Sequence, residues 1–388
     1  MNQNFTMPNF SGLLGPLILI VIVLLIIGGL GAGLSYLIVL WLRNRGREAQ
    51  SLESTLIQVT MPRENEIKID AAEQFFASFA GIKVGGMFSF IKFKPHISFE
   101  LVGMPEDIRF FVYAPNKYKD LVEKQINASY PDAEIKEVSE KTSKEGYIVG
   151  NEYNIFSREG KVAFASFKLA DSNYKPVKVF KDFAVDPMSS LTSVLAKMSV
   201  GEGAAIQVII TGADSKWSKT GRKFIAATKK AESNPETAKY SADPKELEGI
   251  ENKISKPGFY TIIRVVVSSS SQEAADAHLA NIVSTIDQFS GINKFKKNKH
   301  WIKGNFISDF IYRYLPDRNM MILSSEELAG IFHFPNKSVA TPHIHWLNAK
   351  RAPAPAQIPD SGMFLGTSTI RGITKPDYSQ RDERRRHM

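Results

Sequence analysis

The chain has 388 residues, long enough for about two or three domains, and its 43% hydrophobic and 23% charged residues are typical of folded proteins. Its net charge of +9 suits a protein near anionic lipid or nucleic acid but requires neither. The chain contains no cysteine, which excludes disulfides, cysteine-bound zinc, iron–sulfur clusters and a thiol nucleophile.

An uncharged apolar run from Gly12 to Leu42 predicts a transmembrane helix near the N-terminus. A helix needs about 20 apolar residues to cross a bilayer, and this run is longer. One aromatic residue suited to the membrane–water boundary and three cations after the run orient the span: Trp41, Arg43, Arg45 and Arg47. No Lys or Arg precedes the run. The positive-inside rule therefore predicts a single-pass protein of the cytoplasmic (inner) membrane, with the N-terminus outside and the residues after Arg43 in the cytoplasm.

A cleaved signal peptide and a helical hairpin are the two alternatives to a single membrane span. A cleaved signal peptide would carry a basic N-terminal region and a shorter apolar core. A helical hairpin turning at "GGLGAG", residues 28–33, is an alternative topology. The spacing of Gly29 and Gly33 can support helix–helix contact, although glycine is also common in membrane helices.

Residues 51–145 predict an α+β unit with the element order β-α-β-β-α-β. The predicted strands are "TLIQVTMP", "HISFELVG", "DIRFFVYAP" and "AEIKEVSE", and the predicted helices are "DAAEQFFASFAG" and "NKYKDLVEKQINASYP". Asp70 is expected to cap the first helix, with Glu73 completing a capping box.

Residues 146–300 repeat that order. The predicted strands are "KVAFASFKLA", "AAIQVIITG", "GFYTIIRVVVSS" and a lysine-rich edge strand "NKFKKNKH", and the predicted helices are "DPMSSLTSVLAKM" and "SSQEAADAHLANIVSTIDQF". Asp186 is placed to cap the first of these helices, with Pro187 at its first position. The repeat predicts two tandem ferredoxin-like units, the second interrupted by a helical insertion at residues 213–257.

Residues 301–388 have a different character. "LSSEELAGIFHFP" predicts a short helix capped by Ser324 and Glu327, "TPHIHWLNAKRAPAPAQIPDSG" an extended proline-rich arm, and "GMFLGTSTIRG" a strand without a partner in its own segment. The final "RDERRRHM" is either a frayed basic tail or a lead-in to a segment that the chain does not contain, and the lone strand favours the second alternative. The predicted fold class is α+β: a transmembrane helix within residues 1–50, two ferredoxin-like units and an extended C-terminal arm.

The insertion holds the most basic stretch, the predicted helix "SKWSKTGRKFIAATKKAE". Its cations are candidate contacts for nucleic acid or another partner: Lys216, Lys219, Arg222, Lys223, Lys229 and Lys230. Aromatic residues among cations can mark nucleic-acid contact. The alternative is a solvated helix whose Trp217 packs on the sheet.

The sequence carries no P-loop, no G-x-G-x-x-G after a strand and no H-E-x-x-H. His343 and His345 alternate in an extended segment near His333 and can face a metal, but no placed carboxylate accompanies them. Glu326 and Glu327 are adjacent; capping accounts for Glu327, and solvent exposure is expected for Glu326. We therefore predict no catalytic residue, no cofactor and no metal, and a chain that is not an enzyme.

Several phrases occur together in this sequence. "LSSEELAGIFHFP", "RAPAPA", "FLGTSTIRG" and "DERRRHM" accompany "ENEIKIDAAEQFFASFAGI" and "LVEKQINASYPDAEI" in the first block and "FKDFAVDPMSSLTSVLAKMSVGEGAAIQVII" and "DSKWSKTGRKFI" in the second. In this combination, from about Leu56 to Met388, the chain resembles the N-terminal, pre-motor region of membrane-anchored type IV secretion and conjugative DNA-transfer ATPases. These belong to the HerA/FtsK superfamily, and the likeness is to versions from candidate-phyla bacteria.

In that family a run like "RRRHM" leads into a short strand and the P-loop of a RecA-like motor. This sequence stops before the nucleotide site, so no catalytic residue carries over. The resemblance implies a membrane-anchored assembly or accessory region, either the front of a longer ATPase or a stand-alone relative. It implies as partners the lipid bilayer, further copies of the chain, a translocation ATPase domain or subunit, and DNA. The alternative is a membrane-tethered nucleic-acid-binding or scaffold protein unrelated to secretion.

Overall fold

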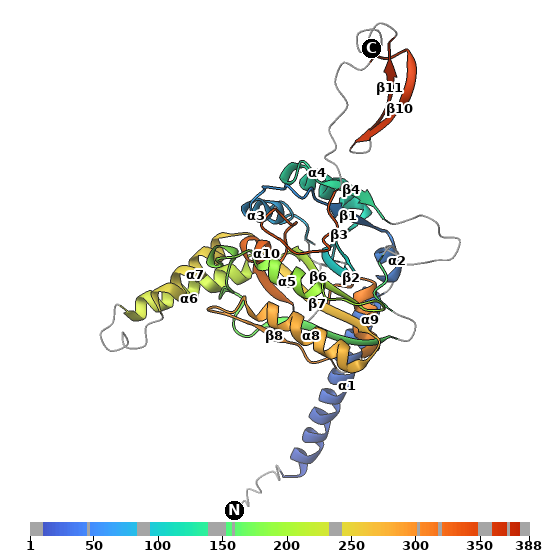
Figure 1. Ribbon diagram of the computed structural model, residues 1–388. Helices are drawn as coiled ribbons and strands as arrows, with labels where there is room; N and C mark the ends of the chain where they lie inside the picture. The colour runs from blue at the N-terminus through green and yellow to red at the C-terminus, as the bar shows by residue number, and fades with distance from the viewer. Residues whose placement is uncertain are drawn as a thin grey trace, which may run out of the picture. The chain divides into compact units, whose positions relative to one another are not determined.

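A computed structural model of the chain describes residues 11–44, 47–83, 94–138, 153–156, 160–232, 243–300, 303–316, 320–347, 359–370 and 373–380 (Figure 1). The chain divides into two compact units. The first contains residues 1–49 with 84–93, and the second contains residues 50–83 with 94–388. A long helix dominates the described part of the first unit, and the described sheets belong to the second.

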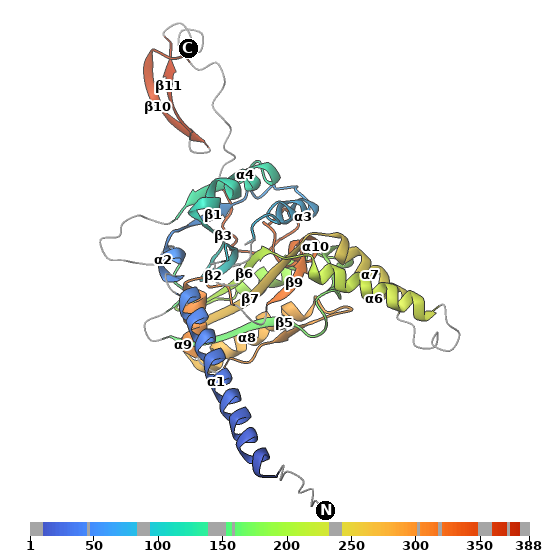
Figure 2. The ribbon, with the colours of Figure 1, turned by 180° about the vertical axis from the view of Figure 1, so that it is seen from behind.

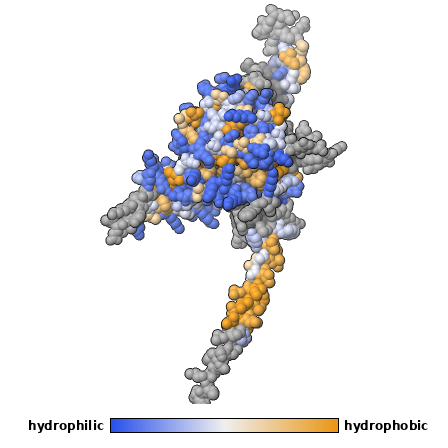
Figure 3. All heavy atoms as spheres, turned by 60° about the horizontal axis from the view of Figure 1, so that its bottom comes forward, coloured by the Kyte–Doolittle hydropathy of each residue, from blue (hydrophilic) through white to orange (hydrophobic). Residues whose placement is uncertain are grey.

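Helix α1 (Ser11–Asn44) forms where the apolar run predicts it. Its segment Ile18–Val39 is the one stretch of the described residues that is long and apolar enough to cross a membrane. The large apolar side chains of this segment are exposed and are orange in Figure 3. A helix satisfies its backbone groups internally, so such a surface suits lipid and is compatible with a single-pass membrane protein. The helix continues through Gly28 and Gly33, so the alternative hairpin does not form.

Nine strands of the second unit's described residues form one antiparallel sheet in the order β4-β1-β3-β2-β6-β7-β5-β8, with β9 also paired to β7 (Figures 1 and 2). The strands are β1 (Ser54–Thr60), β2 (Ile97–Met104), β3 (Asp107–Pro115), β4 (Glu134–Glu137), β5 (Lys161–Leu169), β6 (Gly203–Gly212), β7 (Gly258–Ser269), β8 (Phe295–Lys297) and β9 (Met321–Ser324). The helices between them are α3 (Asp70–Ala77), α4 (Lys119–Ser129), α5 (Pro187–Leu195) and α8 (Gln272–Asp287).

The two halves of this sheet repeat one pattern. β1 to β4 with α3 and α4, and β5 to β8 with α5 and α8, each follow the predicted order β-α-β-β-α-β. In each half the strands lie in the order 4-1-3-2, counted from that half's own first strand. The halves meet where β2 pairs with β6, from Ile97 opposite Ile210 to Gly103 opposite Ala204. The sheet therefore crosses the predicted domain boundary at residues 145/146, and the boundaries themselves stay a prediction.

Side chains alternate between the two faces of the sheet, and one face forms the main core. Phe99 and Leu101 of β2 point to this face, which α3, α4, α5 and α8 cover. Aromatic rings fill this core where the first half of the sheet meets the segment around Phe334. Phe75, for example, contacts the rings of Phe99 and Phe334. Phe75 and Phe76 of α3 are therefore part of the main core.

Helix α10 (Ser325–Ile331) is buried along its whole length and packs against α3 and α5. Its predicted capping box is confirmed, because the Glu327 amide donates to the Ser324 hydroxyl and the Ser324 amide donates to the Glu327 carboxylate. The predicted cap of α5 is confirmed too, since Asp186 accepts from the Met188 amide. The capping box predicted for α3 is wrong: Asp70 is already inside the helix, and Ile69 precedes it without a side-chain cap.

The opposite face of the sheet is covered by α9 (Lys303–Ile311) and residues 153–156 (Figure 2). Phe306 and Phe310 of α9 pack with a smaller apolar cluster that includes Leu56, Val102 and Val266. β9 then extends the sheet beside β7, and α10 follows. Residues 303–316 and 320–347 thus contribute to the sheet and its two cores.

The insertion forms two helices, α6 (Lys216–Glu232) and α7 (Pro244–Ser255), which run side by side and extend from the sheet in Figures 1 and 2. Trp217 packs with Ile225, Ile250 and Ile254. Its indole lies directly on the backbone of Gly258, where an added Cβ would come within 2.4 Å of the ring. Glycine at this position therefore lets α6 approach β7 closely.

The segment that was predicted to be an extended proline-rich arm differs from this prediction in its first residues. Residues 341–347 lie against the sheet's first half, because the Ile108 amide donates to the His343 carbonyl and the Leu347 amide donates to the Met61 carbonyl. Residues 348–358, with the run "RAPAPA", lie outside the described residues.

The strand predicted to lack a local partner has one. β10 (Met363–Ile370) pairs antiparallel with β11 (Ile373–Ser379) in a hairpin. Sequence reasoning missed β11 because Pro376 and Asp377 are unusual in strands. The lone-strand argument for a missing downstream segment is therefore wrong, and "RDERRRHM" itself lies outside the described residues.

Candidate functional site

The six cations predicted as partner contacts all lie on α6 with exposed side chains. Trp217 is only 8% exposed, and the half-buried Phe224 ring lies 5.2 Å from the ring of Tyr174. The aromatic residues therefore pack within the fold, as the solvated-helix alternative states. Contact of the cations with nucleic acid stays a prediction.

Three of the four membrane-orienting residues lie in described segments. Trp41 is exposed near the end of α1, Arg43 lies in the last turn of α1, and Arg47 begins α2 (Arg47–Leu52). Arg45 lies outside the described residues. The direction in which the helix crosses a membrane stays a prediction from charge.

Of the three histidines considered as metal ligands, His333 and His345 lie beside different carboxylates, and His343 is exposed. His333 is buried, and its Nε2 lies 3.1 Å from the Asp186 carboxylate. Burial alone would raise the pKa of Asp186, but the hydrogen bond and charge of His333 hold that pKa below its ordinary value. His345 lies 3.4 Å from Asp107 instead. Within the described ranges, no group of three or more His, Asp or Glu side chains is arranged to hold a metal ion.

The solvent exposure expected for Glu326 is wrong. Its side chain is buried and forms an ion pair of 2.6 Å with Lys181. Glu327 has a second role besides capping: it pairs with the buried Lys253 at 3.1 Å, and it accepts from the Val177 amide. Burial lowers the pKa of Lys253, with the charge of Glu327 opposing that shift. We refer to Lys253 and Glu327 as the Lys253 pair.

A cavity of about 540 Å³ lies beside the Lys253 pair. Its lining comes from the segment before α5, from α7 and from the corner between β9 and α10. The Glu326 and Glu327 carboxylates in its wall are already paired with Lys181 and Lys253. These charges therefore stabilise the meeting point of the insertion with the sheet.

A polar row crosses the other face of the sheet, beneath α9. Residues in register on neighbouring strands point to the same face. The polar residues of this row are Gln58, Glu100, Gln207, Arg264 and Ser166, and Phe111 lies between the first two. All of them are buried. Sequence reasoning did not single them out, although Glu100, Gln207 and Arg264 are each a polar residue inside an otherwise apolar strand. Such residues are the signal that could have found the row, because a buried polar group needs a partner.

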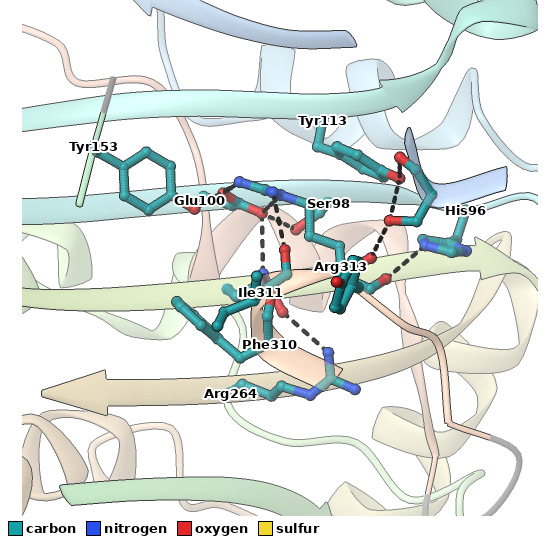
Figure 4. Close-up of polar contacts among 12 residues, drawn as sticks. His96, Ser98, Glu100, Tyr113, Tyr153, Arg264, Phe310, Ile311 and Arg313 are labelled. Carbon is teal, nitrogen blue, oxygen red and sulfur yellow. Dashed lines mark hydrogen bonds and ion pairs between the residues drawn. The ribbon is translucent and has the colours of Figure 1, made fainter. Parts of the chain in front are cut away.

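Arg313, two residues beyond the end of α9, is the cation that pairs with Glu100 of this row (Figure 4). Its Nε and Nη2 donate to the two oxygens of Glu100 at 2.7 and 2.8 Å, a bidentate pairing. Glu100 also accepts from Ser98 at 2.8 Å, from Gln207 at 3.1 Å and from the Tyr153 hydroxyl. We call Glu100, Arg313, Tyr153, Gln207 and Arg264 the Arg313 network.

The charge state of this network follows from burial and pairing. Burial would raise the pKa of Glu100, but the charge and hydrogen bonds of Arg313 hold it below its ordinary value. Burial raises the pKa of the Tyr153 hydroxyl well above its ordinary value, despite the nearby guanidinium. Burial opposes the charge of Arg313, but the Glu100 carboxylate raises its pKa. The network therefore holds one anion, the two cations Arg313 and Arg264, and a neutral phenol.

The network also captures the carbonyl groups at the end of α9, which have no partner inside the helix. Gln207 donates to the Phe310 carbonyl at 3.2 Å, and Arg264 donates to the carbonyls of Asp309 and Tyr314. Two sites outside the network bind the next carbonyls: Ser51 donates to Tyr312 at 2.6 Å, and His96 contacts the Arg313 carbonyl at 2.7 Å. Positive and donor groups at a helix C-terminus also complement its dipole.

The backbone of Arg313 is strained. Its φ is 54°, in the left-handed region, and the Tyr314 amide donates to the Asp309 carbonyl while the Arg313 amide donates to Phe310. This is the Schellman ending of a helix, in which glycine normally takes the left-handed position. An arginine there costs about 1–2 kcal/mol of backbone energy. The cost indicates that the side chain, not the backbone, determines the residue at this position.

Residues 45–347 match the family described as "Domain of unknown function (DUF8128)". The chain belongs to this family. The DUF8128 region covers the nine-stranded sheet, α9 and α10, and it excludes Ile18–Val39 and the β10–β11 hairpin. No curated protein matches the chain.

Within the DUF8128 region, the Arg313 network joins the two halves of the sheet to α9, and contacts outside the network connect α9 to the segment that follows α1 in the sequence. Tyr113 donates to the Ser51 carbonyl at 2.9 Å, and Ser51 donates to the end of α9. The donors and acceptors of the network are used in these contacts. These contacts connect segments that lie far apart in the sequence.

Proposed function

We propose that the chain is the membrane-anchored assembly region of a type IV secretion or conjugation-like translocation ATPase, without a nucleotide site of its own. The observation that carries the proposal is that a helix suited to lipid precedes, in the sequence, a sheet whose two halves are tied to α9 by the Arg313 network. The sequence resemblance supports the same role. The proposal includes a cytoplasmic location for residues after Arg43 and a homo-oligomeric state.

We also propose that the two halves of the sheet are ferredoxin-like units in tandem. Each half has the order β-α-β-β-α-β and the strand order 4-1-3-2, which is the arrangement of that fold. A fold of this kind hosts many functions, so it does not itself identify one. Here the two units pair through their edge strands β2 and β6, which makes one continuous sheet.

Crosslinking in the source membrane tests the assembly role. Lysine-reactive crosslinking of the full chain, followed by mass spectrometry, should capture further copies of the chain and a protein with a P-loop. A crosslinked set with neither would contradict the proposal. Charge-changing variants of the exposed Lys117, in the 3₁₀ turn η1 (Asn116–Tyr118), and of the exposed Lys124, on α4, provide a control, because they should not alter which proteins are crosslinked.

A second candidate function is a membrane-tethered nucleic-acid-binding module. The observation that favours it is the exposure of all six predicted cations on α6. Mobility-shift assays with the full chain in neutral lipid nanodiscs test it. Binding that falls as salt rises would support it, and no binding at low salt would contradict it.

A further inference from the structure

We infer that α6 presents a surface for double-helical nucleic acid that contacts phosphates and does not read bases; this inference rests on the second candidate function. A helix turns about 100° per residue, so the six cations fall within an arc of about 140°. Trp217, Gly221 and Ile225, which are buried, lie on the opposite side of the helix. The cations therefore form one stripe facing away from the fold, and its side of the molecule is largely blue in Figure 3.

The stripe has the length and charge for several phosphate contacts. From Lys216 to Lys230 the helix rises about 21 Å, at about 1.5 Å per residue. Double-helical DNA carries one charge per about 1.7 Å of its axis, so each cation can meet a phosphate. In the described part of the chain, Lys219, Arg222 and Lys223 have no carboxylate within ion-pair distance, whereas Lys216 lies 4.0 Å from Asp214.

The side chains between the cations are small. Thr220, Ala226 and Ala227 are exposed on the same side of α6, so the helix can come close to a flat or grooved polyanion. Five of the six cations are lysines, which act as point charges, and only Arg222 can form the bidentate contacts used to recognise guanine. Contacts to phosphate position a duplex without selecting its sequence.

Single strands and membranes fit this surface less well. Proteins that bind single strands stack bases on exposed aromatic rings, but Trp217 and Phe224 are packed within the fold. Helices that lie on membranes bury an apolar face in the headgroup region, but the apolar face of α6 already packs on α7 and β7. A nucleic-acid duplex, in contrast, can be bound by a row of cations along a straight helix, without exposed aromatic rings or an exposed apolar face.

The test measures binding of fluorescent duplexes of two unrelated sequences to the full chain in phosphatidylcholine nanodiscs, from low to moderate salt. We expect equal affinities for the two duplexes and a slope of log affinity against log salt of about −0.9 for each phosphate contact. Reversal of three cations, Lys219→Glu, Arg222→Glu and Lys223→Glu, should reduce the size of that slope by about 3 and weaken binding at least tenfold.

A matched control reverses the same number of charges elsewhere. Lys117→Glu, Lys124→Glu and Lys136→Glu change the net charge equally, at exposed positions of the sheet's first half, and should leave the slope unchanged. Equal loss in both triple variants would overturn the assignment to α6. Tighter binding of a single strand than of the duplex would overturn the duplex inference but leave the second candidate function. Binding only to vesicles containing phosphatidylserine, and to no nucleic acid, would overturn both.

Discussion

The Arg313 network and the Lys253 pair are two buried ion pairs on opposite faces of one sheet, and they are built differently. Glu100 is held by a bidentate arginine and by donors from three more side chains. Glu327 is held by one lysine and two backbone amides. The first therefore depends on side-chain donors, whereas the second relies on backbone amides for two of its three partners. Both pairs connect segments that lie far apart in the sequence, but the backbone amides remain when a partner side chain is replaced.

Removing the arginine should have the largest effect on stability. Arg313→Met leaves the buried Glu100 without its cation, and we expect a loss of about 3–5 kcal/mol in the free energy of unfolding. Urea unfolding of the detergent-solubilised full chain, followed by tryptophan fluorescence, measures it. Arg313→Gly is the matched variant: it loses the same cation but relieves the left-handed backbone, so it should be more stable than Arg313→Met by about 1 kcal/mol. A glycine variant as stable as the unmodified chain would show that losing the cation costs no more than the strain that glycine relieves, about 1 kcal/mol.

Breaking the Lys253 pair should cost less. In Lys253→Met, Glu327 keeps hydrogen bonds from the amides of Val177 and Ser324, at 2.8 and 2.7 Å. We expect a loss of about 2–3 kcal/mol, because the remaining charge is still bound by two donors. The same urea unfolding measures it. A loss greater than that of Arg313→Met would reverse the comparison between the two pairs.

Alkaline pH should distinguish the two cations by a smaller effect. Burial lowers the pKa of Lys253 below 10.5, so between its folded value and 10.5 the unfolded chain binds more protons than the folded one. The free energy of unfolding of the unmodified chain should therefore rise with pH in this window, relative to Lys253→Met, by at most about 1.4 kcal/mol per pH unit. Arg313 stays charged throughout, so Arg313→Met should retain the rise. Measurements below pH 10 avoid ionisation of tyrosines in the unfolded chain.

The smallest expected effect is local. Ser51→Ala removes the hydrogen bond of 2.6 Å to the Tyr312 carbonyl, and we expect a loss of about 1 kcal/mol or less. Hydrogen exchange should become faster at residues 50–54 and 312–314 and stay unchanged around α10. If Lys253→Met produced the same local change, Ser51 would not belong specifically to the connection made through α9.

Much of the secondary structure followed from local patterns. The apolar run, the two β-α-β-β-α-β blocks and the caps at Asp186 and Ser324 depend on residues close in the chain, and each is found where it was expected. The cap predicted at Asp70 is wrong, and so is the prediction that the strand at residues 363–370 lacks a partner. β11 was missed because an exposed hairpin tolerates residues that a central strand excludes.

The sequence alone determined a lipid-suited helix near one end, the order of the strands and helices in the two β-α-β-β-α-β blocks, and a basic helix within the insertion. These features depend on composition and periodicity, which a chain carries without folding. Only the tertiary structure decided that β2 pairs with β6, that Glu100 meets Arg313 from 213 residues away, and that Trp217 is hidden beneath the lysines. The reason is physical: a buried charge must find its partner in space, and no local pattern records which distant residue will neutralise it.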